Sequence, residues 1–269
     1  MQTCAWHPDR ETFISCTRCG RSICPACMTQ APVGFHCPAC INEARQVLRR
    51  TRPRTTTSVT QALIATNVAI HGLGFLGIGT DSGFVREFGM LPAAVAYNGE
   101  WWRMFTAAFV HAGALHLAMN MIMLWVMGRG VEQVLGRGRF VLLYVLSIFG
   151  GGVASYLVND PLTFGVGASG AIFGLFAAVF MFGREYGRNN QEIGFVIGLN
   201  LLLGFVIPGV DWLAHAGGLV TGAVVSWALL PRRRRPVDVI TVAAVAAVLI
   251  ALVQWRTMDL VANIATVLA

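Results

Sequence analysis

A series of long apolar segments, recurring from residue 59 to the end of the chain, limits the possible folds more than any other feature. A helix needs about 20 mostly apolar residues to cross a hydrocarbon core about 30 Å thick, and segments near this length recur here. Only 12% of the residues are charged, against about 25% in soluble domains, which excludes an ordinary soluble enzyme. We therefore expect an all-α membrane protein. The expected spans lie at about 59–79, 115–128 with an apolar lead-in from Phe105, 140–158, 168–183, 193–210, 211–230 and 237–255.

The basic residues predict the orientation of these spans. The formal net charge is +7, and all 20 basic residues are Arg. Beyond the first 45 residues they mark the ends of apolar segments and form no continuous face, so nucleic-acid binding is not expected. Arg-rich segments alternate with the Arg-poor loops 80–104, 159–167 and 208–210, and Arg-rich loops face the cytoplasm. We expect a plasma-membrane protein with a cytoplasmic N-terminus and, after an odd number of spans, an external C-terminus. The Arg-rich segments are the 43–58 linker (Arg45, Arg49, Arg50, Arg52, Arg54), the Arg129/Arg137/Arg139 loop, the Arg184/Arg188 loop and Arg232 to Arg235.

All seven cysteines lie near the N-terminus and, with one histidine, form four pairs with two residues between the partners. Eight such ligands suffice for two zinc sites, which can stabilise a domain too small for a large apolar core. A disulfide framework is the alternative, but the odd cysteine count and the expected cytosolic location disfavour it. His36 is a spare candidate ligand. The pairs are Cys4 and His7, Cys16 and Cys19, Cys24 and Cys27, and Cys37 and Cys40.

The order Cys-His, Cys-Cys, Cys-Cys, Cys-Cys resembles the B-box type of zinc finger. The resemblance implies that the first pair shares a metal ion with the third pair, and the second with the fourth. Modules of that family usually bind other proteins, so the resemblance implies a cytosolic protein partner. A folded cap without a partner remains the alternative.

Polar side chains within the spans are few, and such residues are functional candidates because hydrocarbon offers them no hydrogen-bond partner. His116 and Asn120 lie four residues apart, on one face of a helix, and both can donate hydrogen bonds to the same point. A contact between helices is the alternative role for this pair. The candidates are His71, His116, Asn120, Glu132, Ser169, Asn200, Asp211 and His215.

Ser169 is a candidate nucleophile. It lies in the segment Gly167-Ala168-Ser169-Gly170, where an Arg-poor loop meets an apolar helix. Small neighbours leave its hydroxyl accessible, and a helix N-terminus offers unpaired N–H groups to a developing oxyanion. The helix has only about 15 apolar residues, roughly 22 Å, so we expect Ser169 below the outer surface, in a water-filled cavity. The alternative is that these glycines serve only helix packing.

His215 is the candidate base. Gly218 and Gly222 make one smooth face of its helix, as Gly170 and Gly174 do on the serine helix, so the two helices can pack closely. Close packing would bring His215 to Ser169, and the imidazole could then take the serine proton. Asp211 shares the face of His215 but lies at the outer boundary, so we interpret it as an interfacial residue and the site as a dyad. Packing, or a place on an ion path, is the alternative for His215.

Taken in order, these residues resemble the rhomboid intramembrane serine proteases over roughly residues 60–230. The resemblance implies a six-helix bundle, with a seventh helix as in the six-plus-one members. It implies a Ser169/His215 dyad and an oxyanion hole formed by the His116 and Asn120 side chains and the Ser169 N–H. It places Trp102 and Arg103 in a first loop partly within the outer leaflet and gives Glu132 a structural role. The matching motifs are Glu100-Trp101-Trp102-Arg103, His111, His116-x3-Asn120, Glu132-x3-Gly136, Gly167-x-Ser169-Gly170 and Ala214-His215-x2-Gly218-x3-Gly222.

One residue departs from the pattern, because Phe173 stands where the family often has a Tyr stacked on the catalytic histidine. The function implied is hydrolysis of a peptide bond in or beside the transmembrane segment of a single-pass protein within the lipid bilayer. It would proceed through an acyl-enzyme and without a catalytic metal. The alternatives are an inactive rhomboid-like protein that binds clients, and a transporter, for which no inverted repeat is visible. The expected domains are a zinc-binding domain at 1–42, a basic linker at 43–58, the six-helix core at 59–230, and a basic loop with a seventh helix at 231–269.

Overall fold

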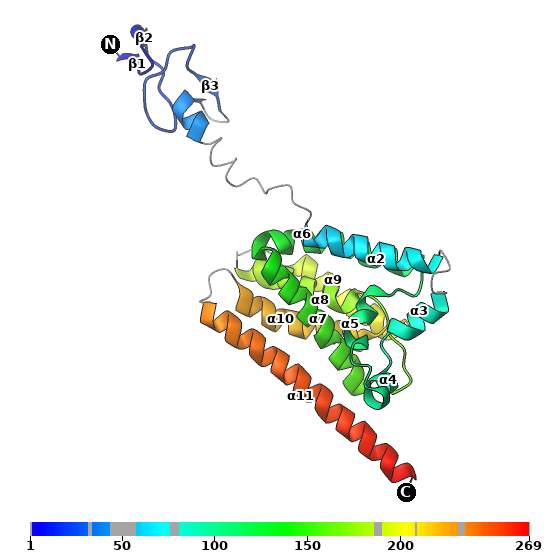
Figure 1. Ribbon diagram of the computed structural model, residues 1–269. Helices are drawn as coiled ribbons and strands as arrows, with labels where there is room; N and C mark the ends of the chain where they lie inside the picture. Colours follow the sequence, from blue (N-terminus) through cyan, green and yellow to red (C-terminus); the bar gives the residue numbers. More distant parts are fainter. Residues whose placement is uncertain are drawn as a thin grey trace. The chain divides into compact units, whose positions relative to one another are not determined.

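The computed structural model describes residues 2–31, 34–43, 58–75, 81–185, 190–207, 209–230 and 235–268. The chain divides into two compact units, Met1–Thr56 and Thr57–Ala269 (Figure 1). Most of the expected basic linker lies outside the described residues, as do Arg188 and Arg232 to Arg234.

The N-terminal unit is built from short strands and tight turns. Strand β1 (Gln2–Cys4) pairs antiparallel with β2 (His7–Thr12), and β3 (Thr29–Gln30) pairs antiparallel with β4 (Phe35–His36). A helical segment follows at 38–43. The interior consists almost entirely of cysteines grouped around the fully buried Ile23. So small an apolar core needs cross-links for stability, which fits the predicted metal-stabilised domain.

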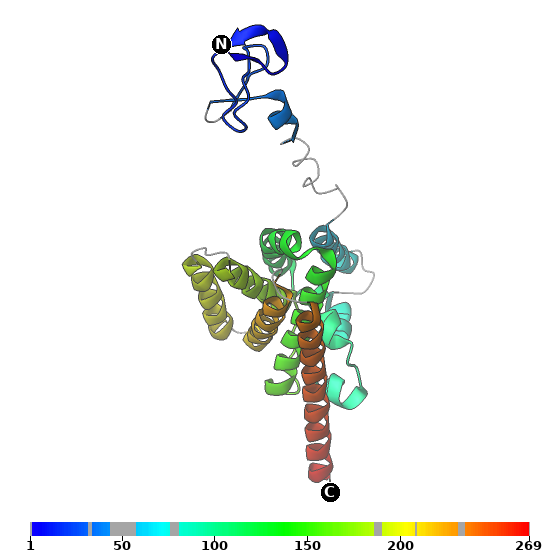
Figure 2. The same ribbon diagram turned by 90° about the vertical axis from the view of Figure 1, so that its left-hand side faces the viewer.

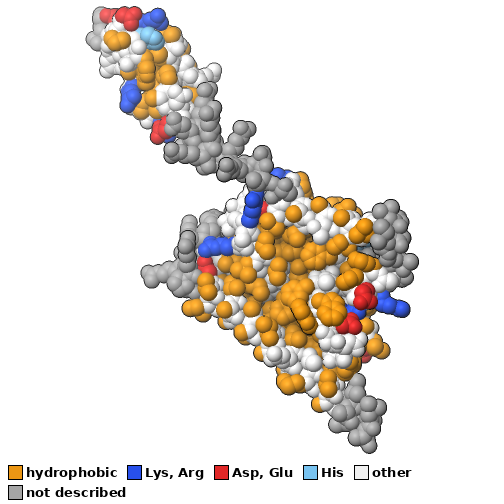
Figure 3. Space-filling view, viewed as in Figure 1, with side chains coloured by type: hydrophobic (Ala, Val, Ile, Leu, Met, Phe, Trp, Pro, Cys, Tyr) orange, Lys and Arg blue, Asp and Glu red, His pale blue; other side chains and the backbone are white. Residues whose placement is uncertain are grey.

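The second unit is helical. Its elements are α2 (Val59–Phe75), α3 (Asp81–Phe88), α4 (Pro92–Asn98), α5 (Arg103–Thr106), the 3-10 helix η1 (Ala107–Phe109), α6 (Ala114–Leu135), α7 (Arg137–Val158), α8 (Ser169–Glu185), α9 (Gln191–Val206), α10 (Trp212–Leu229) and α11 (Arg235–Leu268). A helix therefore occupies every expected span, and the expected helical membrane bundle is confirmed. Within the part of the chain that the structure describes, four segments are long and apolar enough to cross a bilayer: α6, α7, α10 and residues 238–263 of α11, whereas α9 is shorter. Figure 3 shows a largely hydrophobic face on this unit, with charged side chains near its edges.

Two boundaries differ from the sequence prediction. We expected a basic loop around Arg129, but α6 continues to Leu135 and only Gly136 separates it from α7. The turn is this short because Gly136 has a φ of 76°, a conformation open to glycine. Arg129 is accommodated on the helix surface, with its guanidinium 4.5 Å from the Trp125 ring centroid.

Helix α11 extends 13 residues beyond the expected end at 255. Its charged residues suggested a boundary, but Arg256 and Asp259 form an ion pair one turn apart and so satisfy each other. The helix packs on α7, α10 and α4, and its C-terminal end extends past the other helices in Figure 1. Its contacts with α7 include the ion pair of Arg139 with Asp238.

The expected loop at 80–104 is largely folded into α3, α4 and the start of α5. Buried Arg103 holds it together, because its guanidinium pairs with Glu100 and donates to the carbonyl oxygens of Arg86 at 2.7 Å and Gly89 at 2.9 Å. Hydrogen bonds from Asn98 and Arg103 lower the pKa of the Glu100 carboxyl below its ordinary value. The loop is therefore fixed by a charged residue at its centre.

Helices α7, α8 and α10 form the centre of the bundle, and glycines let them approach closely. A Cβ at Gly218 would overlap the carbonyl oxygen of Gly170, and one at Gly222 would overlap the Cα of Gly174. The predicted packing of these glycine faces is confirmed. The backbones of α8 and α10 are thus in direct contact, so side chains of the two helices near this crossing lie close to each other.

Candidate functional site

The first residue of α8 and the first turn of α10 meet at a short polar contact. His215 Nε2 lies 2.7 Å from Ser169 Oγ, within hydrogen-bond distance. The imidazole is buried, with the residue 9% exposed. The proximity predicted from the glycine faces is therefore present, and it results directly from the close crossing of α8 and α10.

The orientation of the His215 ring is set by its neighbours. The Phe173 ring, one turn after Ser169, stacks on it with a centroid separation of 4.4 Å and an interplanar angle of 13°. Gly204 of α9 lies against the other nitrogen, since a Cβ there would be 3.1 Å from His215 Nδ1. Among the described residues Nδ1 has no hydrogen-bond partner. The imidazole is thus held by packing, without a carboxylate.

Asp211 has a different task from that of a third catalytic residue. It caps α10, accepting a hydrogen bond from the Ala214 N–H at 3.1 Å. Its carboxylate also accepts hydrogen bonds from Ser155 Oγ of α7 and from Nδ2 of Asn159, the residue that follows α7. These contacts join the start of α10 to the end of α7, and they agree with the interpretation of the site as a dyad.

His116 and Asn120 lie on α6, on the other side of the serine. A Cβ at Gly167 would be 2.8 Å from His116 Nε2 and 3.9 Å from Asn120 Nδ2, so both polar groups face the segment just before Ser169. Asn120 Nδ2 donates one hydrogen bond to the His116 carbonyl oxygen at 2.9 Å. An amide has a second N–H, which remains available to a ligand. His111 is also buried and meets His116 edge to face, with 5.1 Å between ring centroids.

Several of these side chains, but not His111, line one cavity of about 820 Å³, a volume suited to a peptide segment. Ser169, His215, His116 and Asn120 all lie on its wall, together with the backbone of Gly167. Most of the remaining wall is apolar. The arrangement combines a nucleophile, a base and hydrogen-bond donors around one space, which is what acyl transfer requires.

Residues 98–232 match the Rhomboid domain family, and the match spans half of the chain. The chain belongs to the rhomboid family. It is 34% identical over 148 residues to the putative rhomboid protease YdcA of Bacillus subtilis (strain 168), covering 51% of this chain and 72% of YdcA. The resemblance inferred from the motifs is confirmed.

Two further rhomboid relatives show how the match is distributed. The chain is 36% identical over 165 residues to the rhomboid protease GluP of Bacillus subtilis (strain 168), covering 58% of this chain and 32% of GluP. It is 30% identical over 179 residues to the rhomboid protease AarA of Providencia stuartii, covering 55% of this chain and 63% of AarA. The aligned regions thus span about a third of GluP and just under two thirds of AarA.

Glu132 lies on α6 away from the cavity, and its carboxylate reaches the start of α2. Its carboxylate accepts hydrogen bonds from the N–H of Val59 at 2.8 Å and from the N–H and hydroxyl of Thr60 at 3.0 and 2.7 Å. A negative charge at a helix N-terminus satisfies unpaired amides and complements the helix dipole. Glu132 therefore connects α6 to α2, a structural contact of the kind that the resemblance implied.

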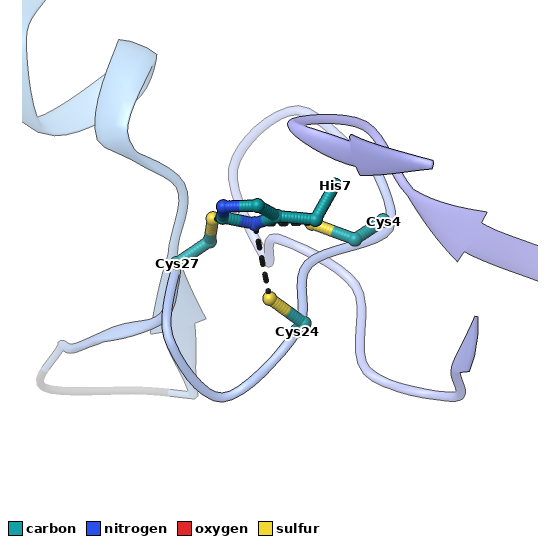
Figure 4. Close-up of side chains that lie close together, drawn as sticks. All are labelled: Cys4, His7, Cys24 and Cys27. Carbon is teal, nitrogen blue, oxygen red and sulfur yellow. Dashed lines mark hydrogen bonds between the residues drawn. The ribbon is translucent and has the colours of Figure 1, made fainter. Parts of the chain in front are cut away.

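The cysteine-rich unit contains two groups of side chains that could hold metal ions. The first is Cys4, His7, Cys24 and Cys27, whose side chains converge in Figure 4. His7 Nδ1 lies 3.2 Å from Cys27 Sγ and 3.4 Å from Cys24 Sγ. His7 Nδ1 lies 3.9 Å from Cys4 Sγ. The edges of a tetrahedral zinc site are about 3.5–3.8 Å, so the three separations scatter around the values that zinc requires.

The second group is Cys16, Cys19, Cys37 and Cys40, with Sγ separations of 3.9 Å for Cys16 and Cys40 and 3.7 Å for Cys19 and Cys37. The two groups join the first pair with the third and the second with the fourth, as the B-box resemblance implied. All seven cysteines are free, and these separations are far longer than a disulfide bond of about 2.05 Å. His36 belongs to neither group among the described residues.

The thiol pKa values indicate what an ion would contribute to each group. Burial disfavours ionisation of Cys4 and Cys16, but hydrogen bonds outweigh it and lower the pKa of each thiol to about 6. Burial and the neighbouring thiolates raise the pKa of Cys27 to about 11 and that of Cys40 to about 12. In each group, one thiol therefore ionises readily, but ionisation of all the thiols together is unfavourable. A bound divalent cation would stabilise the fully ionised group.

The sequence analysis did not select two residues near the Ser169 and His215 cavity, Ser155 and Asn159, which donate hydrogen bonds to Asp211. They lie four residues apart at the end of α7, and such a polar pair near the end of an apolar span is the signal that could have found them.

Proposed function

We propose that the chain is an intramembrane serine endopeptidase that cleaves peptide bonds in or beside transmembrane segments. The observation that carries the proposal is the 2.7 Å separation of His215 Nε2 and Ser169 Oγ on the wall of the 820 Å³ cavity. Relatives whose names describe them as rhomboid proteases support the same conclusion. The substrates would be single-pass membrane proteins with small residues at the cleaved bond, held within the lipid bilayer.

In this mechanism Ser169 Oγ attacks the carbonyl carbon of the scissile bond while His215 Nε2 accepts the hydroxyl proton. The oxyanion that forms is stabilised by the side chains of His116 and Asn120 and by the Ser169 N–H at the start of α8. Collapse of the tetrahedral intermediate breaks the C–N bond, and the imidazolium gives its proton to the leaving amine. The product is an acyl-enzyme on Ser169.

Hydrolysis of the acyl-enzyme repeats these steps with water as the nucleophile. His215 takes a proton from water in the cavity, and the ester bond breaks as the proton returns to Ser169. Stacking on Phe173 keeps the His215 imidazole in one orientation during both proton transfers. No step uses a metal ion.

We assign residues 1–42 to a zinc-binding domain, 43–58 to a basic linker, 59–230 to the protease core, and 231–269 to a basic loop with a seventh transmembrane helix. Two zinc ions would be held by the two ligand groups of the first domain, each supplying a fixed tetrahedral cross-link. The domain would recruit a cytosolic protein partner. The distribution of Arg supports an N-terminus in the cytoplasm and a C-terminus outside, and the membrane we propose is the plasma membrane.

Purified full-length protein in liposomes, with a fluorogenic single-pass substrate, tests the activity. We expect cleavage by the wild type and loss to background in Ser169→Ala and His215→Ala, because each removes one partner of the proton transfer. Phe140→Leu is a suitable control, since Phe140 is fully buried in the core but does not line the cavity. It should retain activity.

Two outcomes would contradict this proposal. Cleavage that persists in both dyad variants would place the chemistry elsewhere. A folded wild type that binds the substrate but cleaves none of a panel of transmembrane segments would favour the inactive, client-binding alternative.

A further inference from the structure

Three polar side chains of the cavity wall lie outside the proposed dyad and oxyanion hole. Ser155 and Asp211 hydrogen-bond to each other, which leaves the side chain of Asn200 on α9. It is exposed, and its Nδ2 donates one hydrogen bond to the Val196 carbonyl oxygen at 2.8 Å. A primary amide has a second N–H and a carbonyl oxygen for further partners. Six residues separate it from the end of α9, about 9 Å along the axis, so it lies within the apolar span.

Asn200 belongs to the face of α9 that borders the cavity. The residues of α9 and its end that line the cavity are Asn200, Leu203, Gly204 and Ile207, at helical spacings of three and four. Gly204 lies against His215 Nδ1. Asn200 is one turn farther along the same face, about 6 Å from Gly204 along the axis. The amide thus stands beside the dyad and outside its immediate contacts. Figure 2 shows α9 at one side of the bundle, and it packs on α8 and α10.

The amide of Asn120 on α6 also lines the cavity, but the proposed mechanism assigns it to the oxyanion. Apart from Asn120 and His116, the side chains that α6 contributes to the cavity are apolar and include Leu115, Met119 and Met123. A polar side chain in such apolar surroundings is costly unless something binds it. Phe195 and Leu202, which are exposed on α9 but do not line the cavity, are apolar. After the polar first turn of α9, which contains Gln191 and Glu192, Asn200 is the one polar side chain of this helix, and it lies on the face toward the dyad.

A transmembrane substrate brings the matching chemistry. Serine can attack a peptide carbonyl only where the substrate helix is unwound, and unwinding frees backbone N–H and C=O groups next to a cavity wall that is mostly apolar. Resting on the proposed function, we propose that Asn200 binds this freed backbone, donating through Nδ2 and accepting through Oδ1. It is a positioning residue that recognises unwound main chain and not a particular side chain.

The test compares two substrates of the same cleavage sequence. One is a single-pass segment in liposomes, and the other is a short water-soluble peptide whose backbone is already hydrated. Asn200→Leu should raise KM for the transmembrane substrate about three- to twentyfold, the range of single hydrogen bonds in membrane proteins, with kcat little changed. Cleavage of the soluble peptide should stay within twofold of the wild type.

Two matched variants sharpen the result. Asn200→Gln keeps both hydrogen-bonding groups and should retain most of the affinity. The double variant Leu199→Asn with Asn200→Leu keeps the composition but turns the amide by about 100° around the helix, away from the cavity, since Leu199 does not line it. It should behave like Asn200→Leu.

The outcomes separate this inference from the proposed function. If the wild type cleaves neither substrate, the proposed function itself fails. If the wild type is active and Asn200→Leu leaves KM unchanged, the inference fails. An equal loss on both substrates, or full rescue by the shifted amide, would assign Asn200 a role in folding and overturn the proposal.

Discussion

The stacking of Phe173 on His215 leads to a quantitative prediction. The rings lie 4.4 Å apart at 13°, and Phe173 is 3% exposed. An aromatic pair contributes about 0.5–1.5 kcal/mol beyond its buried area. If this energy holds the imidazole in its reactive orientation, Phe173→Leu should lower kcat about two- to thirteenfold. Phe173→Tyr keeps the ring and should remain close to the wild type.

The assay is cleavage of a fluorogenic transmembrane substrate by purified protein in liposomes, with kcat and KM measured separately. Phe140→Leu is the matched control because it makes the same change in the core, where Phe140 stacks on Tyr144 and not on the dyad. Both Leu variants should lose similar thermal stability, but only Phe173→Leu should lose kcat. An unchanged kcat in Phe173→Leu, or an equal fall in Phe140→Leu, would refute the orienting role of the ring.

Three further predictions concern parts of the chain that support the site. Glu132→Ala removes the acceptor of three hydrogen bonds at the start of α2. It should lower the free energy of unfolding, measured in mixed micelles, by about 3 kcal/mol. An unchanged free energy of unfolding would contradict the capping role of Glu132. Glu100→Gln should lower Tm at pH 7, because the folded protein lowers the pKa of Glu100 and is therefore stabilised by its charge. This stabilisation is complete above the ordinary carboxyl pKa and is lost as the pH falls through the lowered pKa. The Tm difference should shrink toward zero under acid conditions, and a difference that is constant with pH would count against the ion pair with Arg103. Metal analysis should return two zinc ions per chain, and Cys16→Ser should lose one while the Cys4 group keeps its ion; loss of both or neither would argue against two separate sites.

Most of the helical architecture could be predicted from the sequence because the apolar segments are long and the bilayer fixes their length. The glycines at 170, 174, 218 and 222 also predicted which helices cross closely, and the crossing accounts for the proximity of Ser169 and His215. The predicted end of α11 at residue 255 was wrong, because Arg256 and Asp259 form an ion pair within the helix. Local charge alone does not reveal such pairing.

The surroundings of Asp211 could not be predicted, for a related reason. The sequence places this residue at the boundary of a span, but its partners Ser155 and Asn159 come from α7, more than fifty residues earlier. Hydrophobic patterning specifies which face of a helix is buried and does not specify which polar groups will meet there. The spacing of the cysteine pairs fixed the ligand set, whereas their grouping followed from a resemblance.

Labelling of Ser169 by a serine-directed fluorophosphonate tests the central claim most directly, because the probe reacts only with an activated hydroxyl. Full-length protein in liposomes is treated with the probe, and the modified residue is located by mass spectrometry. We predict modification at Ser169 in the wild type, and none in His215→Ala. Equal modification of Ser169 in both proteins, or a folded wild type that leaves Ser169 unmodified, would contradict activation of this serine by His215.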